Sequence, residues 1–148
     1  MVREINFYCR ECGNGILLSG PPFPEMSRCE KCNIDYPVKA DPALSGGRPL
    51  ENCPRCDGSE FYVQKDFNRN LGLAVAILAA LGVYLVFGLT WKSLVGLLAI
   101  AGLDALLYRI LPLITICYRC KTIYRGFPIN PAHSAFDLHV GEKYRKPS

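Results

Sequence analysis

Two long apolar runs dominate the second half of the chain. Residues 71–90 contain no charged residue, and residues 94–114 contain only two. Each run has the ~20 residues that a helix needs to cross a ~30 Å hydrocarbon core. Only residues 91–93 lie between them, so we expect two neighbouring antiparallel helices. The pattern predicts a two-span transmembrane hairpin over residues 71–112, in preference to an apolar hairpin buried inside a soluble protein.

Elsewhere the apolar residues come in short stretches, such as residues 16–18 and 61–63, which fit short β-strands. Residues 41–50 combine proline, glycine and polar side chains, and this composition predicts a linker. Residues 126–148 show no clear periodicity and contain three prolines. We therefore expect an extended C-terminal tail at residues 129–148.

All eight cysteines of the chain occur in Cys-x-x-Cys pairs, two on each side of the linker. The pairs are Cys9/Cys12, Cys29/Cys32, Cys53/Cys56 and Cys117/Cys120. Eight thiols in four such pairs indicate two four-thiolate metal sites, whereas disulfides are the competing interpretation. Two soluble modules formed by the residues outside the apolar runs would each bury little apolar surface. Small modules of this kind usually need a metal or disulfides to fold.

The pairs alternate between two types. In the first type, glycine follows closely and an apolar run comes next, as after Cys12 and Cys56. In the second type, a tyrosine lies four residues after the last cysteine: Tyr36 follows Cys32 in this way, and Tyr124 follows Cys120. If the first type is called A and the second type B, the order along the chain is A-B-A-B. This order is an internal duplication at the level of motifs.

Each A+B unit resembles a zinc ribbon, in which two turns at the tips of short β-hairpins hold one metal tetrahedrally. The resemblance implies a first ribbon at residues 1–40 and a second ribbon assembled from residues 51–70 and 113–128. The predicted fold class is therefore small metal-bound β structure (two zinc ribbons) plus an α-helical two-span transmembrane hairpin. The hairpin is inserted into the second ribbon.

The motif order predicts which cysteines share a metal. The expected ligands of site 1 are Cys9, Cys12, Cys29 and Cys32, and those of site 2 are Cys53, Cys56, Cys117 and Cys120. Pairing Cys32 with Cys53 also fits the allowed gap, but the linker composition of residues 41–50 argues against it.

Two Zn²⁺ ions are the expected cofactors. Four thiolates fill a tetrahedral zinc site and leave no position for water or substrate, so we expect a structural role. Iron in one or both sites is the alternative, because tetrahedral S₄ ligation suits either metal. An Fe(Cys)₄ site would resemble rubredoxin and would carry one electron.

The distribution of charge suggests an orientation. Lys65 and Arg69 precede the first apolar run, and four basic residues accompany or follow the second, whereas the connecting turn carries Lys92 alone. The positive-inside tendency places both termini, and with them both metal sites, in the cytoplasm. No apolar run precedes Cys9, so we expect no cleavable secretory signal, and a reducing compartment agrees with free thiols. The expected location is an integral membrane one, the inner or plasma membrane if the source is bacterial.

Asp104 lies about 15 Å from either end of its run, near the bilayer midplane. A charge there is costly, so we expect a carboxyl that is protonated, paired or facing protein. Tyr108, four residues on, is a local partner. A latch to another subunit is the second interpretation and a proton relay the third, although no second membrane acid or histidine is available for a relay.

The sequence offers no catalytic constellation, and we expect a protein that is not an enzyme. No glycine-rich phosphate loop is present, no nucleophile lies in a triad motif, and His133 and His139 belong to no metal-binding motif. Residues 1–70 carry nine Lys/Arg against ten Asp/Glu, so the basic stripe of a nucleic-acid binder is missing.

The predicted function is that of a non-catalytic accessory or scaffold subunit of a larger membrane complex, anchored in the lipid bilayer and contacting its partner through the hairpin and the tail. The first alternative is a membrane-tethered, rubredoxin-like electron carrier. The second is a membrane-tethered zinc ribbon that binds nucleic acid. No small-molecule substrate is evident.

Overall fold

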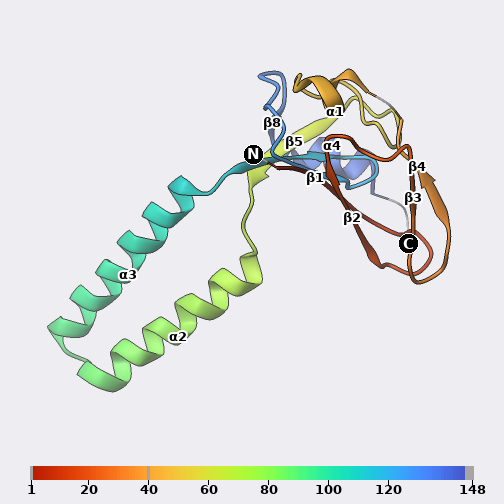
Figure 1. Cartoon of the computed structure of the whole chain (residues 1–148). Coiled ribbons are helices and arrows are strands. Elements are labelled where there is room, and N and C mark those ends of the chain that lie inside the picture. Colours follow the sequence, from red (N-terminus) through yellow and green to blue (C-terminus); the bar gives the residue numbers. More distant parts are fainter. Residues whose placement is uncertain (1, 40, 146–148) are drawn as a thin grey trace. The chain divides into compact units, whose positions relative to one another are not determined.

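The computed structural model describes residues 2–39 and 41–145 and divides into two compact units (Figure 1). One unit comprises Met1–Gln64 together with Leu113–Ser148, and the other is Lys65–Pro112. The first unit is therefore built from both ends of the chain, and the second is inserted into it. Met1, Ala40 and the last three residues of the predicted tail lie outside the described residues.

A mixed six-stranded sheet organises the first unit. Its strand order is β2-β1-β7-β6-β5-β8. The strands are β1 (Arg3–Tyr8), β2 (Gly15–Gly20), β5 (Phe61–Lys65), β6 (Leu113–Cys117), β7 (Ile123–Arg125) and β8 (Ser134–Ala135). β1 pairs antiparallel with β2 and with β7, β6 pairs antiparallel with β7, and β5 pairs parallel with β8. Segments from both ends of the chain thus form one sheet.

This sheet differs from the predicted pair of separate ribbons, because β1 and β7 come from different predicted ribbons. An isolated β1–β2 hairpin would leave one edge of β1 with unpaired backbone groups. Pairing with β7 satisfies that edge and sets Ile5 opposite Tyr124. The register leaves both side chains almost fully buried. The two predicted ribbons therefore share a sheet and a hydrophobic core.

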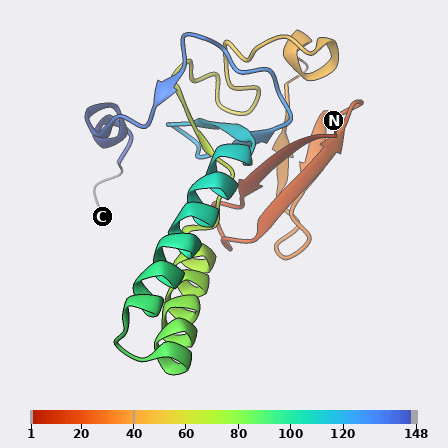
Figure 2. The same ribbon diagram turned by 90° about the vertical axis from the view of Figure 1, so that its left-hand side faces the viewer.

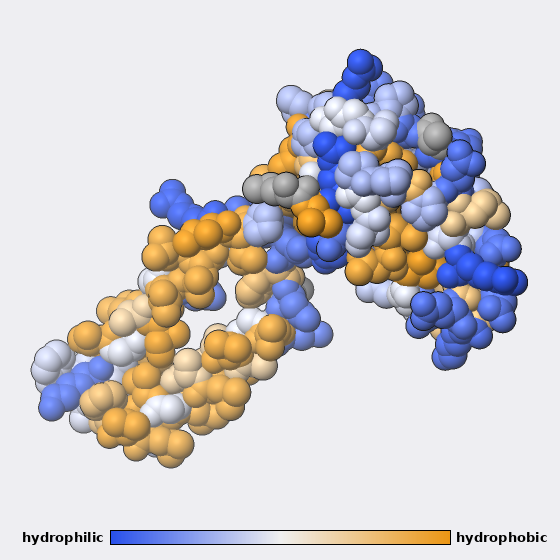
Figure 3. All heavy atoms as spheres, in the orientation of Figure 1, coloured by the Kyte–Doolittle hydropathy of each residue, from blue (hydrophilic) through white to orange (hydrophobic). Residues whose placement is uncertain are grey.

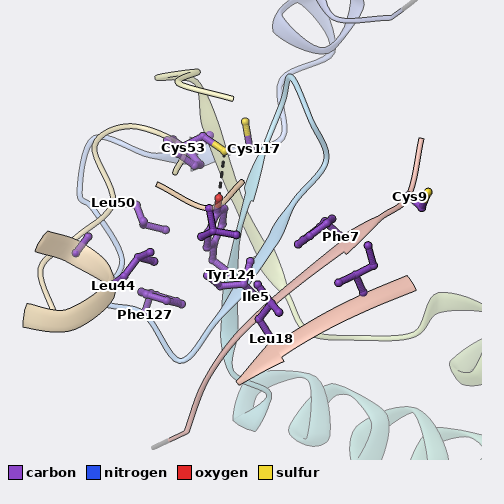
Figure 4. Close-up of a cluster of buried hydrophobic side chains, with 14 of the residues drawn as sticks. Ile5, Phe7, Cys9, Leu18, Leu44, Leu50, Cys53, Cys117, Tyr124 and Phe127 are labelled. Carbon is purple, nitrogen blue, oxygen red and sulfur yellow. Dashed lines mark hydrogen bonds between the residues drawn. The ribbon is translucent and has the colours of Figure 1, made fainter. Parts of the chain in front are cut away.

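Alternation along the strands builds this core. Ile5 and Phe7 of β1 are buried together with Ile16 and Leu18 of β2, each set at every second position. Figure 4 shows Ile5, Phe7 and Leu18 beside residues from the second predicted ribbon and from the predicted linker. The shared cluster includes Ile5, Phe7, Leu18, Leu44, Leu50, Phe61, Tyr124 and Phe127.

The predicted linker contributes to the core. It contains a short helix, α1 (Pro42–Gly46), whose first turn is capped by Asp41 accepting from the Ala43 N–H at 2.7 Å. The helix buries Ala43 and Leu44. A small separate hairpin, β3 (Met26–Arg28) with β4 (Asp35–Pro37), carries the second cysteine pair.

The second unit is a pair of helices, α2 (Arg69–Phe87) and α3 (Trp91–Ile110), which lie side by side in both views (Figures 1 and 2). Asn68 caps α2 by accepting from two backbone N–H groups. Gly88 ends α2 with a φ of 59°, a backbone conformation that favours glycine. The connection is therefore 88–90, and residues 91–93, predicted to be the turn, form the first turn of α3.

The second helix also ends earlier than the predicted apolar run. Leu111 is extended, as expected for a residue that precedes proline, and the run 113–117 is strand β6. Its apolar residues Ile114 and Ile116 are buried in the sheet unit, together with Thr115. The Asp66 N–H donates to the Pro112 carbonyl at 2.9 Å, so the two ends of the helical unit are hydrogen-bonded to each other.

The helices expose almost only apolar side chains (Figure 3). Two segments, Asn70–Phe87 and Trp91–Ile110, are long and apolar enough to cross a membrane by length and composition. A Cβ on Gly96 would lie 3.2 Å from a Val83 methyl group, so the small residue permits close packing there. Asp104 is exposed, and none of the described residues donates a hydrogen bond to its carboxyl group.

The tail is less extended than its composition predicts. It contains β8 and the helix α4 (Leu138–Lys143), which Asp137 caps by accepting from the His139 N–H at 2.8 Å. The Asp137 N–H itself donates to the Tyr118 hydroxyl at 2.6 Å. Phe136 stacks on Tyr118 and meets Tyr62 edge-on. These aromatic contacts fold the tail back onto the sheet unit.

Candidate metal centres

The four cysteine pairs lie in four turns of the same geometry. In each turn, the N–H of the residue after the second cysteine donates to the carbonyl of the first cysteine at 2.8–3.1 Å. That residue has a positive φ in every case: Gly13 (69°), Asn33 (58°), Asp57 (59°) and Lys121 (57°). Asparagine and aspartate tolerate this conformation, but lysine rarely adopts it. Glycine, which follows closely in the first type of motif, fills this position in one turn of four.

The first centre consists of Cys9, Cys12, Cys29 and Cys32. Their sulfur atoms all lie within 4.8 Å of one another. The Cys9–Cys32 sulfur distance is 3.4 Å and the Cys12–Cys29 distance is 3.5 Å. The ligands come from the β1–β2 turn and the β3–β4 turn, so a single contiguous stretch of chain supplies the whole centre.

The second centre consists of Cys53, Cys56, Cys117 and Cys120, again with all sulfur atoms within 4.8 Å. The Cys53–Cys120 distance is 3.5 Å and the Cys56–Cys117 distance is 3.7 Å. Its first pair precedes β5 and the helical unit, and its second pair begins at the last residue of β6. The eight thiols thus gather into the two sets that the motif order predicts, and Cys32 is not grouped with Cys53.

The geometry of both centres fits a tetrahedral metal. Zn–S bonds of ~2.3 Å in a tetrahedron place the sulfur atoms ~3.8 Å apart, close to the spacings above. In every pair the first cysteine is buried and the second is partly exposed. Both clusters could therefore bind metal ions, and they are compatible with zinc-ribbon-like sites. Four sulfur ligands of this kind suit zinc or iron and fill all tetrahedral positions.

Side-chain hydroxyl groups contact the sulfur atoms in both centres. The Tyr36 hydroxyl lies 3.1 Å from Cys9 Sγ, and the Tyr124 hydroxyl lies 3.1 Å from Cys53 Sγ (Figure 4). At the second centre, the Thr122 hydroxyl is also 3.0 Å from Cys120 Sγ. The sequence marked both tyrosines as part of the duplication, but it gave no sign that they reach across to the opposite cysteine pair.

These contacts shift protonation equilibria. Hydrogen bonds from the Tyr36 hydroxyl and from backbone N–H groups lower the pKa of the Cys9 thiol to about 6. The same contact raises the pKa of Tyr36. Burial, followed by the proximity of Cys53, raises the pKa of Tyr124 well above its usual value. Both tyrosines therefore keep their protons at neutral pH, and Cys9 is disposed to be a thiolate.

Arg55 connects the two centres. It lies within the third cysteine turn, and its guanidinium stacks over the Phe7 ring at 4.2 Å and over the Tyr36 ring at 5.1 Å. It also donates to the Thr122 hydroxyl at 3.5 Å and to the Tyr8 carbonyl at 3.4 Å. A residue between two ligands of one centre thus packs against the aromatic side chains beside the other.

The two histidines take no part in these centres. His133 stacks on Phe61, with ring centroids 4.7 Å apart, and burial lowers its pKa. His139 lies in the first turn of α4. Within residues 2–39 and 41–145, neither belongs to a cluster of potential metal ligands.

Comparisons of the chain with protein-family models, with curated proteins and with solved structures found no match. The two four-cysteine centres and the two apolar helices are therefore the features that bear on function.

Proposed function

We propose that this chain is an integral membrane protein that holds a structural zinc ion in each of its two centres and acts as a non-catalytic accessory or scaffold subunit of a larger membrane complex. The observation that carries this proposal is the composition of the second centre. Its ligands come from two segments, Cys53/Cys56 and Cys117/Cys120, on either side of the apolar helical pair.

Zinc is proposed because it suits a closed tetrathiolate site and needs no further ligand. Cys9, Cys12, Cys29 and Cys32 would hold one ion, and Cys53, Cys56, Cys117 and Cys120 the other. The metal would supply cross-linking between chain segments, and it would offer no open position for substrate. These two sets of ligands therefore support a role in holding the structure together.

The membrane topology follows from the second centre. Thiolates that share one metal must lie on the same side of a bilayer, and two spans between Cys56 and Cys117 meet that condition. The basic residues around the ends of the helical pair favour the cytoplasm for both termini, and the cytoplasm keeps thiols reduced. In a bacterium this would be the inner or plasma membrane.

A scaffold role is proposed because the helices present apolar side chains on most of their surface and only one face of each meets the other helix. Membrane helices associate through close packing, and two helices leave much surface for lipid and for a partner. The hairpin and the C-terminal tail are the proposed contact regions. Metal at the second centre would fix the chain at both ends of this hairpin.

Metal analysis and a topology map test the proposal together. The full chain, purified in detergent, is expected to be colourless and to contain two zinc ions. Reporter fusions before residue 2 and after residue 145 are expected to be cytoplasmic, and a reporter in the 88–90 turn is expected on the opposite side. Termini on opposite sides of the membrane would overturn the topology, and a metal-free native protein would overturn the zinc assignment.

An electron carrier with iron is the second candidate, and the hydroxyl contacts favour it. Hydrogen bonds to sulfur ligands are among the factors that set the reduction potential of iron–thiolate sites. A red protein that bleaches on reduction would establish this alternative, whereas zinc without colour would exclude it.

A further inference from the structure

The two tyrosines occupy equivalent places in the two centres. Tyr36 and Tyr124 each lie four residues after the last cysteine of their own pair, on β4 and β7. Each hydroxyl contacts the first cysteine of the opposite pair at the same distance, 3.1 Å. Both copies of the duplicated motif therefore make the same contact, from the tyrosine hydroxyl to the first cysteine of the opposite pair. One explanation should apply to both centres.

The surroundings of Tyr36 fix the direction of its hydrogen bond. The Arg10 N–H donates to the Tyr36 hydroxyl oxygen at 3.0 Å, so the hydroxyl already accepts one hydrogen bond. A metal-bound cysteine is a thiolate and has no proton to give. The Tyr36 hydroxyl therefore donates to Cys9 Sγ, and by the same reasoning the Tyr124 hydroxyl donates to Cys53 Sγ.

We propose that Tyr36 and Tyr124 are positioning residues of the two centres, whose hydroxyl groups donate to metal-bound thiolates, withdraw charge from sulfur and make Cys9 and Cys53 less reactive toward electrophiles and acid. This inference rests on the proposed function, since it requires a metal in each centre. It assigns to the tyrosines a role beyond packing.

The charge of such a centre explains why donors are needed. Four thiolates around one divalent ion carry a net charge of about −2, and hydrogen bonds to charged groups are stronger than those between neutral groups. Tyr124 is only 1% exposed, so water does not replace its hydroxyl at Cys53. The ring positions the donor, and the hydroxyl supplies the hydrogen bond.

The two centres differ in the number of side-chain donors. The second has Thr122 beside Cys120 as well as Tyr124 beside Cys53, whereas the described residues place only Tyr36 beside the first. We therefore expect the thiolates of the second centre to react more slowly than those of the first. The Thr122 hydroxyl acts on Cys120 in the same way as the Tyr124 hydroxyl acts on Cys53, since both side chains provide an O–H group.

The test uses the full chain in detergent, loaded with Co²⁺ for spectroscopy and with Zn²⁺ for alkylation by iodoacetamide. Tyr36→Phe and Tyr124→Phe remove only the hydroxyl groups. Tyr62→Phe is the matched control, because Tyr62 is a buried tyrosine whose hydroxyl makes no hydrogen bond to sulfur within the described part of the chain. Thr122→Val provides an independent variant at the second centre, should Tyr124→Phe fail to fold.

Two results would support the proposal. The sulfur-to-cobalt charge-transfer band should move to lower energy in Tyr36→Phe and Tyr124→Phe, because the thiolate becomes richer in electrons. Alkylation, mapped by mass spectrometry, should rise about tenfold or more at Cys9 in the first variant and at Cys53 in the second, the lower end of the range expected for the loss of one hydrogen bond to a charged group. Tyr62→Phe should match the wild type.

Band positions and alkylation rates equal to those of the wild type, in variants that still bind two metal ions, would overturn the proposal and leave the zinc assignment intact. A uniform rise at all eight cysteines would also overturn it, since that result indicates general loosening. A wild-type chain that binds no metal would contradict the proposed function itself, so the two failures are distinguishable.

Discussion

The two centres are built from the same turns but from very different lengths of chain. At the first, Cys9 and Cys32 are 23 residues apart, whereas Cys53 and Cys120 at the second are 67 residues apart, with the helical pair between them. Loop-closure entropy makes the longer connection, 61 residues against 17 for the inner cysteines, costlier by only about 1 kcal/mol. The length of the inserted segment therefore changes the free energy of closing a centre only slightly, and the centres differ mainly in which segments they join. The first centre organises a local fold, and the second joins two distant segments.

The largest expected effect is that of removing both metals. Structural zinc contributes on the order of 10 kcal/mol or more to the folding of small modules. Cys9, Cys29, Cys53 and Cys117 lie within the shared core, so empty centres would leave buried thiols or thiolates without their cross-link. Treatment with a strong chelator should abolish the β-sheet signal in circular dichroism while the helical signal remains. Retention of the β-sheet signal in metal-free protein would contradict a structural role for the metal.

Breaking one centre at a time should separate their roles. Cys29→Ser should reduce the zinc content from two to one and loosen mainly β3 and β4. Cys117→Ser should also reduce the zinc content from two to one. It should in addition expose residues 113–128 to protease, because Phe61, Tyr124 and Phe127 pack beside the second centre. Limited proteolysis with peptide mapping measures the difference. Identical cleavage patterns would show that the centres are structurally equivalent.

Arg55 provides a way to weaken the link between the centres while keeping all eight ligands. Its stacking over Phe7 and Tyr36 should be worth about 1–2 kcal/mol. Arg55→Ala should lower the unfolding free energy of the zinc-loaded sheet unit by about that amount and should make zinc release from the two centres less concerted. Arg48→Ala is the control, because Arg48 is an exposed arginine outside the cysteine turns. An Arg55→Ala protein as stable as the Arg48→Ala protein would show that Arg55 does not stabilise the packing between the two centres.

The smallest expected effect is the pH dependence of stability that comes from His133. Its ring stacks on Phe61, which packs against Tyr124 of the second centre. Burial lowers its pKa in the folded chain, so the unfolded chain binds a proton more readily. The contribution of the neutral His133 ring to stability is complete above the pKa of histidine in the unfolded chain, ~6.5. It is lost as the pH falls through the lower pKa of His133 in the folded chain. An NMR titration should place the His133 ring below ~6.5, with His139→Gln used to assign the two rings. A His133 pKa above 6.5 would contradict the burial against Phe61.

The cysteine pattern carried much of the prediction of the candidate centres. Spacing alone located the four turns, and the alternation of motif types grouped Cys9 with Cys29 and Cys53 with Cys117. Apolar length likewise located both helices to within a few residues. Local sequence is informative here because thiol spacing and helix length are themselves local quantities.

Features that depend on tertiary contacts could not be found in this way. Nothing in β1 or β7 specifies that Ile5 pairs with Tyr124, so the single sheet was missed. The apolar residues 113–114 extended the second predicted run, because hydropathy does not distinguish a buried strand from the end of an apolar helix. Lys121 adopts a positive φ because its turn requires it, and the reach of Tyr36 to Cys9 depends on how two hairpins face each other.

The central claim is that one metal joins the chain segments before and after the helical pair. The most direct measurement is a ¹¹³Cd–¹H correlation spectrum of the cadmium-loaded full chain, with the cysteine β-protons assigned. We expect two cadmium signals, one correlated with Cys9, Cys12, Cys29 and Cys32 and the other with Cys53, Cys56, Cys117 and Cys120. A cadmium signal that correlates Cys53 with Cys29 or Cys32, or one that lacks Cys117 and Cys120, would contradict it.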